Sequence, residues 1–328
     1  MIVVDGRVLG GAATGIQRVA RGLLDGATVP RRVLAPRGVV DPRVDRVLPI
    51  GQPRLWEQVV LPAAAGSRLV LSLANTAPLL ARRSAVLVHD LAPLREPAWF
   101  VPRMRWYARA VASAARHADV VLTPSAAVAR ELEEVLGVRG ATVVRPAVTG
   151  EPSRPEQVDA ARRRHRLERP YAVLVGWGDP RKDLATALAA HRLVRADVPH
   201  DLVLVGQPHP NLAAVAAPAD DSVRVLGRLD DDELGAVLTG AAVLLHPSVY
   251  EGFGLPPLEA WVRGTPALVA DVPAVREATW DLAPVLPQRD VPAWASALRE
   301  ALTGGLTVPE LPSWTWDDVG RDLDSALS

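Results

Sequence analysis

The sequence alternates between short apolar runs and longer stretches of helical spacing, and this pattern constrains the fold more than any other feature. Short continuous apolar runs that alternate with helices are typical of parallel sheets covered by helices. The alternation is interrupted once, where Pro and Arg are frequent and no strand-like run occurs, over residues 146–170. The apolar runs lie at residues 2–4, 69–73, 85–88, 119–123 and 142–144 before the interruption, and at 172–176, 202–206, 223–227, 243–245 and 267–270 after it.

The interruption and the length together predict two domains. A chain of 328 residues is too long for one ordinary core and long enough for two. We expect α/β domains of the doubly wound, Rossmann-like kind at residues 1–150 and 171–310. A linker at 151–170 would carry one helix, and residues 311–328 would end in another. Ligands of such sheets bind beyond the carboxyl ends of the strands, so two such domains would face each other across a binding cleft.

Composition excludes several classes of protein. The chain has no Cys, so it has neither disulfides nor thiolate chemistry, and its seven His form no HExxH-like pair. We therefore expect no metal site built by the protein. No apolar run reaches the eighteen residues of a transmembrane helix. The first residues lack the basic region and long apolar core of a signal peptide, which favours a cytoplasmic protein.

Charge is unevenly distributed along the chain. Residues 1–150 contain 20 Arg against 11 Asp and Glu, whereas the remainder contains 17 Lys and Arg against 26 Asp and Glu. The basic half could face an anionic acceptor or the inner surface of a membrane, or the two halves could simply attract each other. A predicted basic helix over residues 100–118, FVPRMRWYARAVASAARHA, could likewise meet a lipid-linked acceptor or be a packed helix with a solvated face. No nucleic-acid-binding module is recognisable.

The stretch EGFGLPPLE at residues 251–259 holds two carboxylates, Glu251 and Glu259, around a glycine-containing loop. It follows the buried run at 243–245, and its two glycines allow close approaches that a side chain would block. A Pro-Pro pair is typical of the first turn of a helix, which predicts that Glu259 lies in that turn and that the helix ends near Gly264. A strand, a glycine loop and a helix N-terminus in succession favour an anionic ligand. Either Glu alone could equally be a cap or a solvated side chain.

Lys182 is the only lysine of the chain, and all 36 other basic side chains are Arg. It lies in WGDPRKDL, between the run at 172–176 and a predicted helix that begins at Leu184. A compact ammonium at a helix start suits a phosphate, and Arg181 could add a fork of donors. The alternative is a solvated helix start.

Other strand ends carry weaker signals. His89, which precedes Asp90 after the run at 85–88, could donate to an anionic or hydroxyl oxygen, or be structural. The loop from Gly10 to Gly15 resembles a phosphate loop only loosely, and a simple turn explains it almost as well. Arg228, after the run at 223–227, could line the cleft or pair with the acidic residues at 230–233.

Eight stretches, spread in order over nearly the whole chain, give the sequence a family resemblance. It resembles the retaining glycosyltransferases of sequence family 4, which have the GT-B fold, and LWEQVVLP is similar to a segment of their mannosyltransferase-like branch. The most specific part of the resemblance is the pair of Glu separated by seven residues around GFGLP. The stretches are TGIQRVARGLL, LWEQVVLP, VHDLAPLREPAWF, ADVVLTPSAAVARELEEVLGV, DPRKDL, VLGRLDDDEL, HPSVYEGFGLPPLEAWVRGTPALVAD and SWTWDDV.

The resemblance implies roles for individual residues in holding a nucleotide-sugar donor. Lys182, with Arg181, would bind the diphosphate and Glu259 would accept hydrogen bonds from the ribose. Glu251 would lie near the donor sugar. The backbone of Phe253, Gly254 and Leu255 would contact the sugar and phosphate, His89 would face the sugar, and Gly15 would bring backbone close to the phosphates. Ser125 matches a family position of less certain role.

The sequence departs from the family pattern at two points. Many relatives have an Arg two or three residues before the PRK stretch, where this chain has Trp177 and Asp179. Many have Asn after the Lys, where this chain has Asp183. The first departure could weaken diphosphate binding or transfer that duty to Arg181.

The resemblance implies a GT-B fold whose C-terminal helix crosses back to the N-terminal domain, and transfer of a hexose with retained configuration. The donor would be a nucleotide-diphosphate sugar, with a GDP-hexose such as GDP-mannose favoured and UDP- and dTDP-sugars open. No permanently bound cofactor or metal is expected. The acceptor would be a saccharide, a lipid-linked molecule or a small molecule, with nucleic acid excluded and peripheral membrane association left open. The alternatives are a nucleotide-sugar epimerase of the same fold and a non-catalytic two-domain binding protein.

Overall fold

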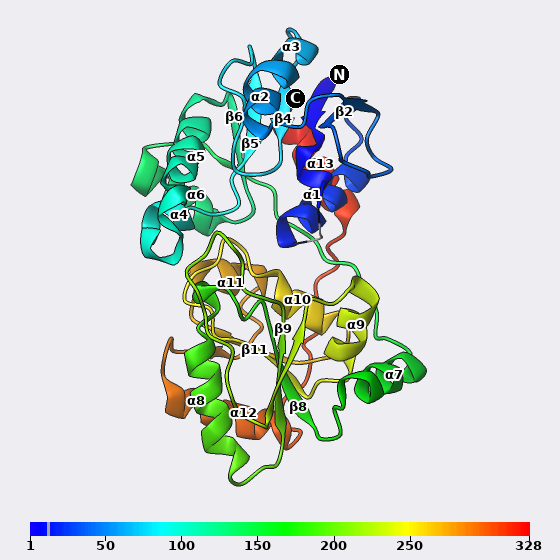
Figure 1. The fold of residues 1–328 in the computed structure, drawn as a ribbon, viewed down its shortest axis with the longest axis vertical. Helices are drawn as coiled ribbons and strands as arrows, with labels where there is room; N and C mark the ends of the chain where they lie inside the picture. The colour runs from blue at the N-terminus through cyan, green and yellow to red at the C-terminus, as the bar shows by residue number, and fades with distance from the viewer. Residues whose placement is uncertain (12–13) are drawn as a thin grey trace. The chain divides into compact units, whose positions relative to one another are not determined.

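The computed structural model describes residues 1–11 and 14–328, which form two compact units (Figure 1). Unit 1 consists of Met1–Arg95, Arg103–Ala147 and Ser313–Ser328. Unit 2 consists of Glu96–Pro102 and Val148–Pro312. Each unit is built around its own parallel sheet, as the alternation of apolar runs and helices predicts.

Unit 1 contains a seven-stranded sheet in the order β3-β2-β1-β4-β5-β6-β7, and every neighbouring pair is parallel. Its central strands are buried almost throughout, which explains why they appear in the sequence as continuous apolar runs. The strands are β1 (Ile2–Asp5), β2 (Arg31–Pro36), β3 (Arg46–Leu48), β4 (Val70–Ser72), β5 (Ser84–Leu87), β6 (Val120–Thr123) and β7 (Thr142–Val143).

The helices of unit 1 begin and end at capping residues that the sequence shows directly. Ser125 accepts a hydrogen bond from the backbone N–H of Val128 at 3.2 Å, and Gly137 ends the same helix with a left-handed φ of +68°. The helical elements are η1 (Gly6–Leu9), α1 (Gly15–Gly26), α2 (Pro53–Leu55), η2 (Trp56–Val60), α3 (Leu61–Ala65), α4 (Ala92–Arg95), η4 (Pro102–Met104), α5 (Arg105–His117), α6 (Ala126–Leu136) and α13 (Trp316–Ala326).

The C-terminal helix α13 belongs to unit 1, as the family resemblance implies. Figure 1 shows α13 in red beside α1 in dark blue, and the two helices are in contact. Small residues allow this approach, because a Cβ added at Gly26 would lie 1.8 Å from the carbonyl oxygen of Trp316. Asp324 also accepts hydrogen bonds from the backbone N–H of Thr28 at 2.8 Å and of Val29 at 3.1 Å.

Unit 2 contains a six-stranded sheet in the order β10-β9-β8-β11-β12-β13, again parallel throughout. Helix α8 packs against α12, and α7 packs against α9. The stretch predicted to link the domains therefore belongs to unit 2, together with its helix α7. The strands are β8 (Tyr171–Val175), β9 (Asp201–Val205), β10 (Val223–Gly227), β11 (Val243–His246), β12 (Ala267–Ala270) and β13 (Val285–Leu286). The helices are η3 (Pro97–Trp99), α7 (Pro155–His165), η5 (Pro180–Lys182), α8 (Leu184–Arg195), α9 (Asp231–Thr239), α10 (Leu255–Trp261), α11 (Pro273–Ala278) and α12 (Val291–Leu302).

Two features differ from the sequence prediction. Strands β2, β3 and β13 were not predicted, because β2 and β3 begin with Arg and β13 consists of two residues between Pro284 and Pro287. The helix predicted over residues 100–118 begins only at Arg105, since the residue before a proline disfavours helical backbone. Before Pro102 the chain is extended and pairs within unit 2, where Val101 N–H donates to the Asn211 carbonyl at 3.1 Å.

Candidate active site

The carboxyl ends of two neighbouring strands of unit 2 bring the most specific sequence signals together. Strands β8 and β11 pair directly and in parallel, so the loops that follow them leave the sheet at the same edge. The loop after β8 carries Arg181 and Lys182, and the loop after β11 carries Glu251. A backbone hydrogen bond from Val249 N–H to the Arg181 carbonyl, 2.8 Å long, ties the two loops to each other.

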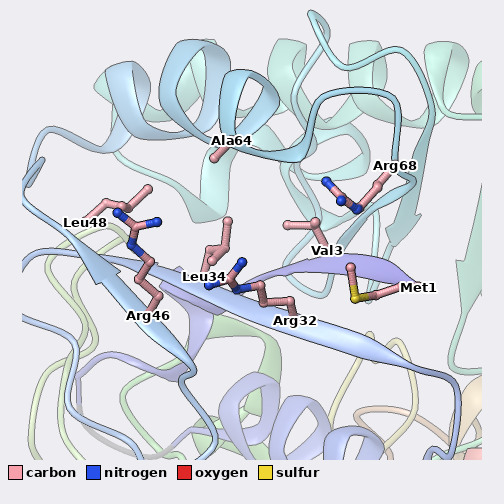
Figure 2. A pocket seen from close by; sticks show the side chains of 8 residues that line it. All are labelled: Met1, Val3, Arg32, Leu34, Arg46, Leu48, Ala64 and Arg68. Atoms are coloured by element: carbon pink, nitrogen blue, oxygen red, sulfur yellow. The ribbon is translucent and has the colours of Figure 1, made fainter.

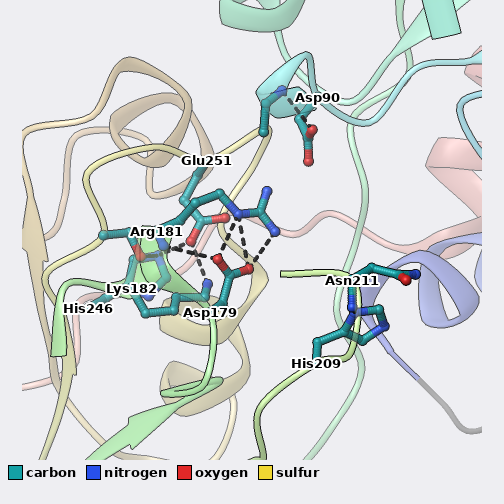
Figure 3. A network of polar contacts seen from close by, with 10 residues as sticks. Asp90, Asp179, Arg181, Lys182, His209, Asn211, His246 and Glu251 are labelled. Atoms are coloured by element: carbon teal, nitrogen blue, oxygen red, sulfur yellow. Dashed lines mark hydrogen bonds and ion pairs between the residues drawn. The ribbon is translucent and has the colours of Figure 1, made fainter. Parts of the chain in front are cut away.

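Lys182, Glu251 and His246 form the centre of this edge (Figure 3). The Lys182 Nζ lies 2.5 Å from Glu251 Oε1, and the same oxygen lies 3.3 Å from His246 Nε2. All three side chains are largely buried, with exposed fractions of 14%, 12% and 2% respectively. We call the set of Asp179, Arg181, Lys182, His246 and Glu251 the Lys182 cluster.

The charges of the cluster follow from its geometry. Burial alone would raise the pKa of Glu251, but the Lys182 ammonium and the hydrogen bond from His246 outweigh it and hold that pKa well below its usual range. Burial, with help from the Lys182 charge, lowers the pKa of His246. At neutral pH the cluster therefore holds an ionised carboxylate against an ammonium, with a neutral imidazole that donates to the carboxylate.

Glycine at two positions lets backbone and side chains approach closely at this edge. Gly254 has a φ of +101°, and a Cβ there would lie 3.0 Å from Val275 Cγ2 and 3.6 Å from His246 Nε2. A Cβ at Gly178 would lie 2.5 Å from the backbone of Gln207. A side chain at either position would displace the neighbouring chain.

Arg181 is held by Asp179, one of the two residues at which the sequence departs from the family's arginine. Its guanidinium Nη2 lies 2.6 Å from Asp179 Oδ2, and Asp179 also accepts from the Arg181 backbone N–H at 3.0 Å. Trp177 is buried, and its Nε1 donates to the Gly206 carbonyl at 2.8 Å. Asp183 adopts a left-handed φ of +43° and accepts a hydrogen bond from Thr186. Both departures from the family pattern thus have structural partners.

The helix after the glycine loop corrects one prediction. Helix α10 spans Leu255–Trp261, so it begins before the Pro-Pro pair and ends before Gly264. Glu259 therefore lies in its second turn, not its first, and is 8% exposed. The prolines stabilise the first turn without starting it, because Leu255 already has helical backbone after the left-handed Gly254. Phe253 is buried in the core of unit 2.

Arg228 lies after β10 and is exposed. Two of the acidic residues that follow it have structural contacts: Asp230 caps α9 by accepting from Glu233 N–H at 2.8 Å, and Glu233 Oε1 lies 2.9 Å from both Arg164 and His165. These contacts fasten α7 to α9.

In unit 1, His89 lies just beyond the carboxyl end of β5 and is 8% exposed. Its Nε2 lies 2.9 Å from the Leu73 carbonyl, which can only accept, so Nε2 carries the ring hydrogen. Burial lowers the pKa of His89, which favours a neutral ring. The expectation that this ring donates to a ligand is therefore corrected: Nε2–H is already used, and Nδ1 can only accept.

Gly15 is the first residue of α1 and is exposed. The loop that leads to it was compared with a phosphate loop, but Ala12 and Ala13 within that loop lie outside the described residues.

Sequence analysis missed a buried network at the carboxyl end of β1. Asp5 accepts from Trp56 Nε1 at 2.8 Å, and Arg7 Nη2 lies 2.7 Å from Glu57 Oε1. Thr76 also donates to Glu57 at 2.5 Å. The single signal was an aspartate that ends the buried run IVVD. His246 was not predicted as a site residue either, because a histidine at the end of a strand is usually structural.

A separate hollow in unit 1 is lined by arginines and apolar side chains (Figure 2). Arg46 and Arg32 lie at or next to the first residue of β3 and β2 respectively. The lining residues of β2 and β3 alternate along the strands, so the hollow lies over one face of the sheet, next to Ala64 of α3, and not beyond the carboxyl ends where ligands of such sheets bind.

Within residues 1–11 and 14–328, no group of three or more His, Cys, Asp or Glu is arranged to hold a metal ion. Across the same residues, no helix is long and apolar enough to cross a membrane.

Comparison with known proteins finds a family model that matches part of unit 2. Residues 169–304 match the family model described as glycosyl transferases group 1. The O-antigen chain mannosyltransferase RfbU of Salmonella typhimurium is 24% identical over 244 residues, which cover 73% of this chain and 66% of that protein. The matched regions are 36% and 29% of the length of two further mannosyltransferases, both from Escherichia coli.

Solved structures share the fold of both units. Sucrose-phosphate synthase from Thermosynechococcus elongatus has a TM-score of 0.65 at 18% identity, over 99% of this chain and 93% of that one. Anabaena HepE, in complex with UDP and glucose, has a TM-score of 0.64 at 14% identity, over 99% of this chain and 94% of that one. The matches confirm the resemblance and favour neither the epimerase nor the binding protein. The chain carries a glycosyl transferases group 1 domain at residues 169–304 and has the GT-B fold of glycosyltransferases.

Proposed function

We propose that the chain is a retaining glycosyltransferase that moves a hexose from a nucleotide-diphosphate sugar to a hydroxyl of a saccharide, lipid-linked or small-molecule acceptor. The observation that carries this proposal is the buried Lys182–Glu251 pair, 2.5 Å apart, at the carboxyl edge of a glycosyl transferases group 1 domain. A GDP-hexose such as GDP-mannose is the favoured donor, since several relatives are mannosyltransferases. UDP- and dTDP-sugars stay open, and UDP is bound in the HepE structure.

Each residue of the site receives a role in this proposal. Lys182 and Arg181 hold the diphosphate, and Glu251 orients the sugar close to them. Glu259 accepts from the ribose. Further contacts to the donor are assigned to Gly15, Arg228, Phe253, Gly254 and Leu255, and His89 is assigned to the sugar.

The proposed reaction is a displacement on one face of the sugar. The bond from the anomeric carbon to the diphosphate oxygen breaks, and the acceptor oxygen bonds to the same face. The acceptor's proton passes to the departing phosphate oxygen. The Lys182 ammonium stabilises the charge that develops on that oxygen. Because Lys182 and Arg181 supply positive charge, we propose that the reaction needs no metal ion. Glu251 is paired with Lys182 and His246, so we assign it to orientation and not to nucleophilic attack.

The location proposed for the enzyme is the cytoplasm, with peripheral attachment to an anionic membrane as one option. Unit 1 supports the option with Trp106, which is 47% exposed, and with the Arg54 guanidinium 4.5 Å from the centre of its ring. Flotation with vesicles of anionic and of neutral lipid would separate the two cases.

The proposed donor site is tested with a thermal-shift panel of GDP, UDP, dTDP and ADP. A nucleotide at a hundred times its dissociation constant should stabilise the protein by about 2.7 kcal/mol. We expect a shift with one nucleotide that is lost in Lys182→Ala and in Glu259→Ala. Arg299→Ala and Glu168→Ala remove the same charges from exposed positions of unit 2 and should keep the shift. No shift with any nucleotide or its sugar would contradict the proposal.

A further inference from the structure

Asn75, just beyond the carboxyl end of β4 in unit 1, is held in an unusual conformation. It is 4% exposed and has a φ of +62°, in the left-handed region that residues other than glycine seldom adopt. Its backbone N–H donates to the Leu87 carbonyl at 3.0 Å. Asparagine tolerates this region better than most residues, and strained positions of this kind concentrate at functional sites.

The amide of Asn75 joins the backbone of His89 to the side chain of Tyr107. Its Oδ1 accepts from the backbone N–H of His89 at 2.5 Å, and its Nδ2 lies 3.1 Å from the hydroxyl of Tyr107. A backbone N–H can only donate, which fixes Oδ1 towards His89 and the NH₂ group towards Tyr107. We call Asn75, His89 and Tyr107 the Asn75 cluster.

This orientation determines what Tyr107 can offer a ligand. Because Asn75 donates to the Tyr107 oxygen, the phenolic hydrogen remains available for donation. Burial raises the pKa of Tyr107 to about 12, so the phenol keeps this hydrogen at neutral pH. The His89 ring uses Nε2–H on the Leu73 carbonyl, so its Nδ1 remains as an acceptor. The Asn75 amide therefore orients the Tyr107 hydroxyl as a donor, while the His89 ring is held separately by the Leu73 carbonyl.

We propose that Tyr107, positioned by Asn75, binds a saccharide by donating its phenolic hydrogen to a sugar oxygen. A sugar hydroxyl oxygen accepts such a hydrogen bond. The cluster lies at the carboxyl edge of the sheet, where ligands of such folds bind. This inference extends the proposed function, because it names a group with which unit 1 recognises a sugar.

The test measures binding of methyl α-mannopyranoside and methyl α-glucopyranoside by saturation-transfer NMR, with and without the nucleotide that gives a thermal shift. Tyr107→Phe removes only the hydroxyl and should weaken binding of the recognised glycoside about tenfold. Tyr171→Phe is the matched control, since Tyr171 donates to the Val237 carbonyl inside unit 2. That variant should bind the glycoside as the wild type does.

A second variant separates positioning from simple folding. Asn75→Gly keeps the left-handed backbone but removes the amide, so it should weaken glycoside binding at least as much as Tyr107→Phe. Adding Tyr107→Phe to Asn75→Gly should then cost less than about threefold more, because the tyrosine has already lost its orientation. A purely structural role would give independent, additive losses and no effect specific to glycosides.

The outcomes separate this inference from the proposed function. No saturable glycoside binding by the wild type under either condition, wild-type binding by Tyr107→Phe, or an equal loss in Tyr171→Phe would overturn the inference. Glycoside binding that depends on Tyr107, in a protein that no nucleotide or nucleotide sugar stabilises, would support the inference and reject the nucleotide-sugar donor. A nucleotide shift without glycoside binding would support the nucleotide-sugar donor and reject the inference.

Discussion

The two polar clusters lie at corresponding edges of their sheets but are built differently. The Lys182 cluster comes from two short stretches, residues 179–182 and 246–251, and its central contact joins opposite charges. The Asn75 cluster comes from three separate places in the sequence and joins a side-chain amide to a phenol and to the backbone N–H of His89. Charged groups suit a diphosphate, whereas neutral donors and acceptors suit sugar hydroxyls. We therefore propose that the Lys182 cluster serves mainly the diphosphate and that the Asn75 cluster serves a sugar hydroxyl.

The largest expected effect would come from removing the charge of Lys182. Lys182→Met should lower kcat about 100- to 1000-fold, because the ammonium acts on charge that develops in the transition state. Binding of a methyl glycoside to unit 1 should be unchanged. Steady-state kinetics with the donor found in the nucleotide panel would measure the loss. Arg299→Met, on the exposed face of α12, should keep full activity, and an equal loss in both variants would contradict a specific role.

The unfolding free energy should also depend on whether one or both charges of the Lys182–Glu251 pair are removed. Lys182→Met leaves the Glu251 carboxylate buried without its main partner, which should cost about 3 kcal/mol of unfolding free energy. Glu251→Gln added to that variant removes the orphaned charge and should recover part of the loss. Urea unfolding of the two single variants and the double variant gives the coupling. Additive single losses would show that the pair contributes little despite the 2.5 Å contact.

The two clusters also differ in how much of each could be predicted from the sequence. The donor-side motif could be recognised because its residues are contiguous, and glycine and proline positions constrain such a loop strongly. Lys182 could be singled out because it is unique among Arg residues. His246, Asn75 and Tyr107 could not, because their partners are set by which strands become neighbours in the folded sheet. The turn of α10 that carries Glu259 was misjudged because Gly254, and not the prolines, determines where the helix begins.

A smaller loss of stability, confined to unit 1, should follow from Asp5→Ala. Asp5 accepts from Trp56 Nε1 and from the Arg7 backbone N–H, both within 3.0 Å, so its removal strands two buried donors. We expect a cost of about 2 kcal/mol. Nucleotide binding should be unchanged, because no residue of this network is assigned to the donor. Calorimetry with and without nucleotide measures both quantities. A loss of nucleotide affinity in this variant would show that the Asp5 network also affects donor binding, which contradicts the prediction.

The smallest expected effect is on how the unfolding free energy changes at acidic pH. One carboxylate from each unit, Glu251 and Asp5, changes it in opposite directions. Glu251 has its pKa lowered from 4.5 in the folded protein, so below about pH 4.5 the unfolded chain binds more protons and stability falls as pH falls. Burial raises the pKa of Asp5 from 3.8. Between 3.8 and its folded value, the folded protein therefore binds more protons, and stability falls as pH rises.

Substitution of each carboxylate by its amide should therefore change the pH dependence in opposite directions. Glu251→Gln should flatten the loss of stability between pH 5 and pH 3.5, and Asp5→Asn should steepen it. Denaturant unfolding at several pH values provides the slopes, relative to the wild type at the same ionic strength. If both variants changed the slope in the same direction, the two carboxylates would not differ in electrostatic environment.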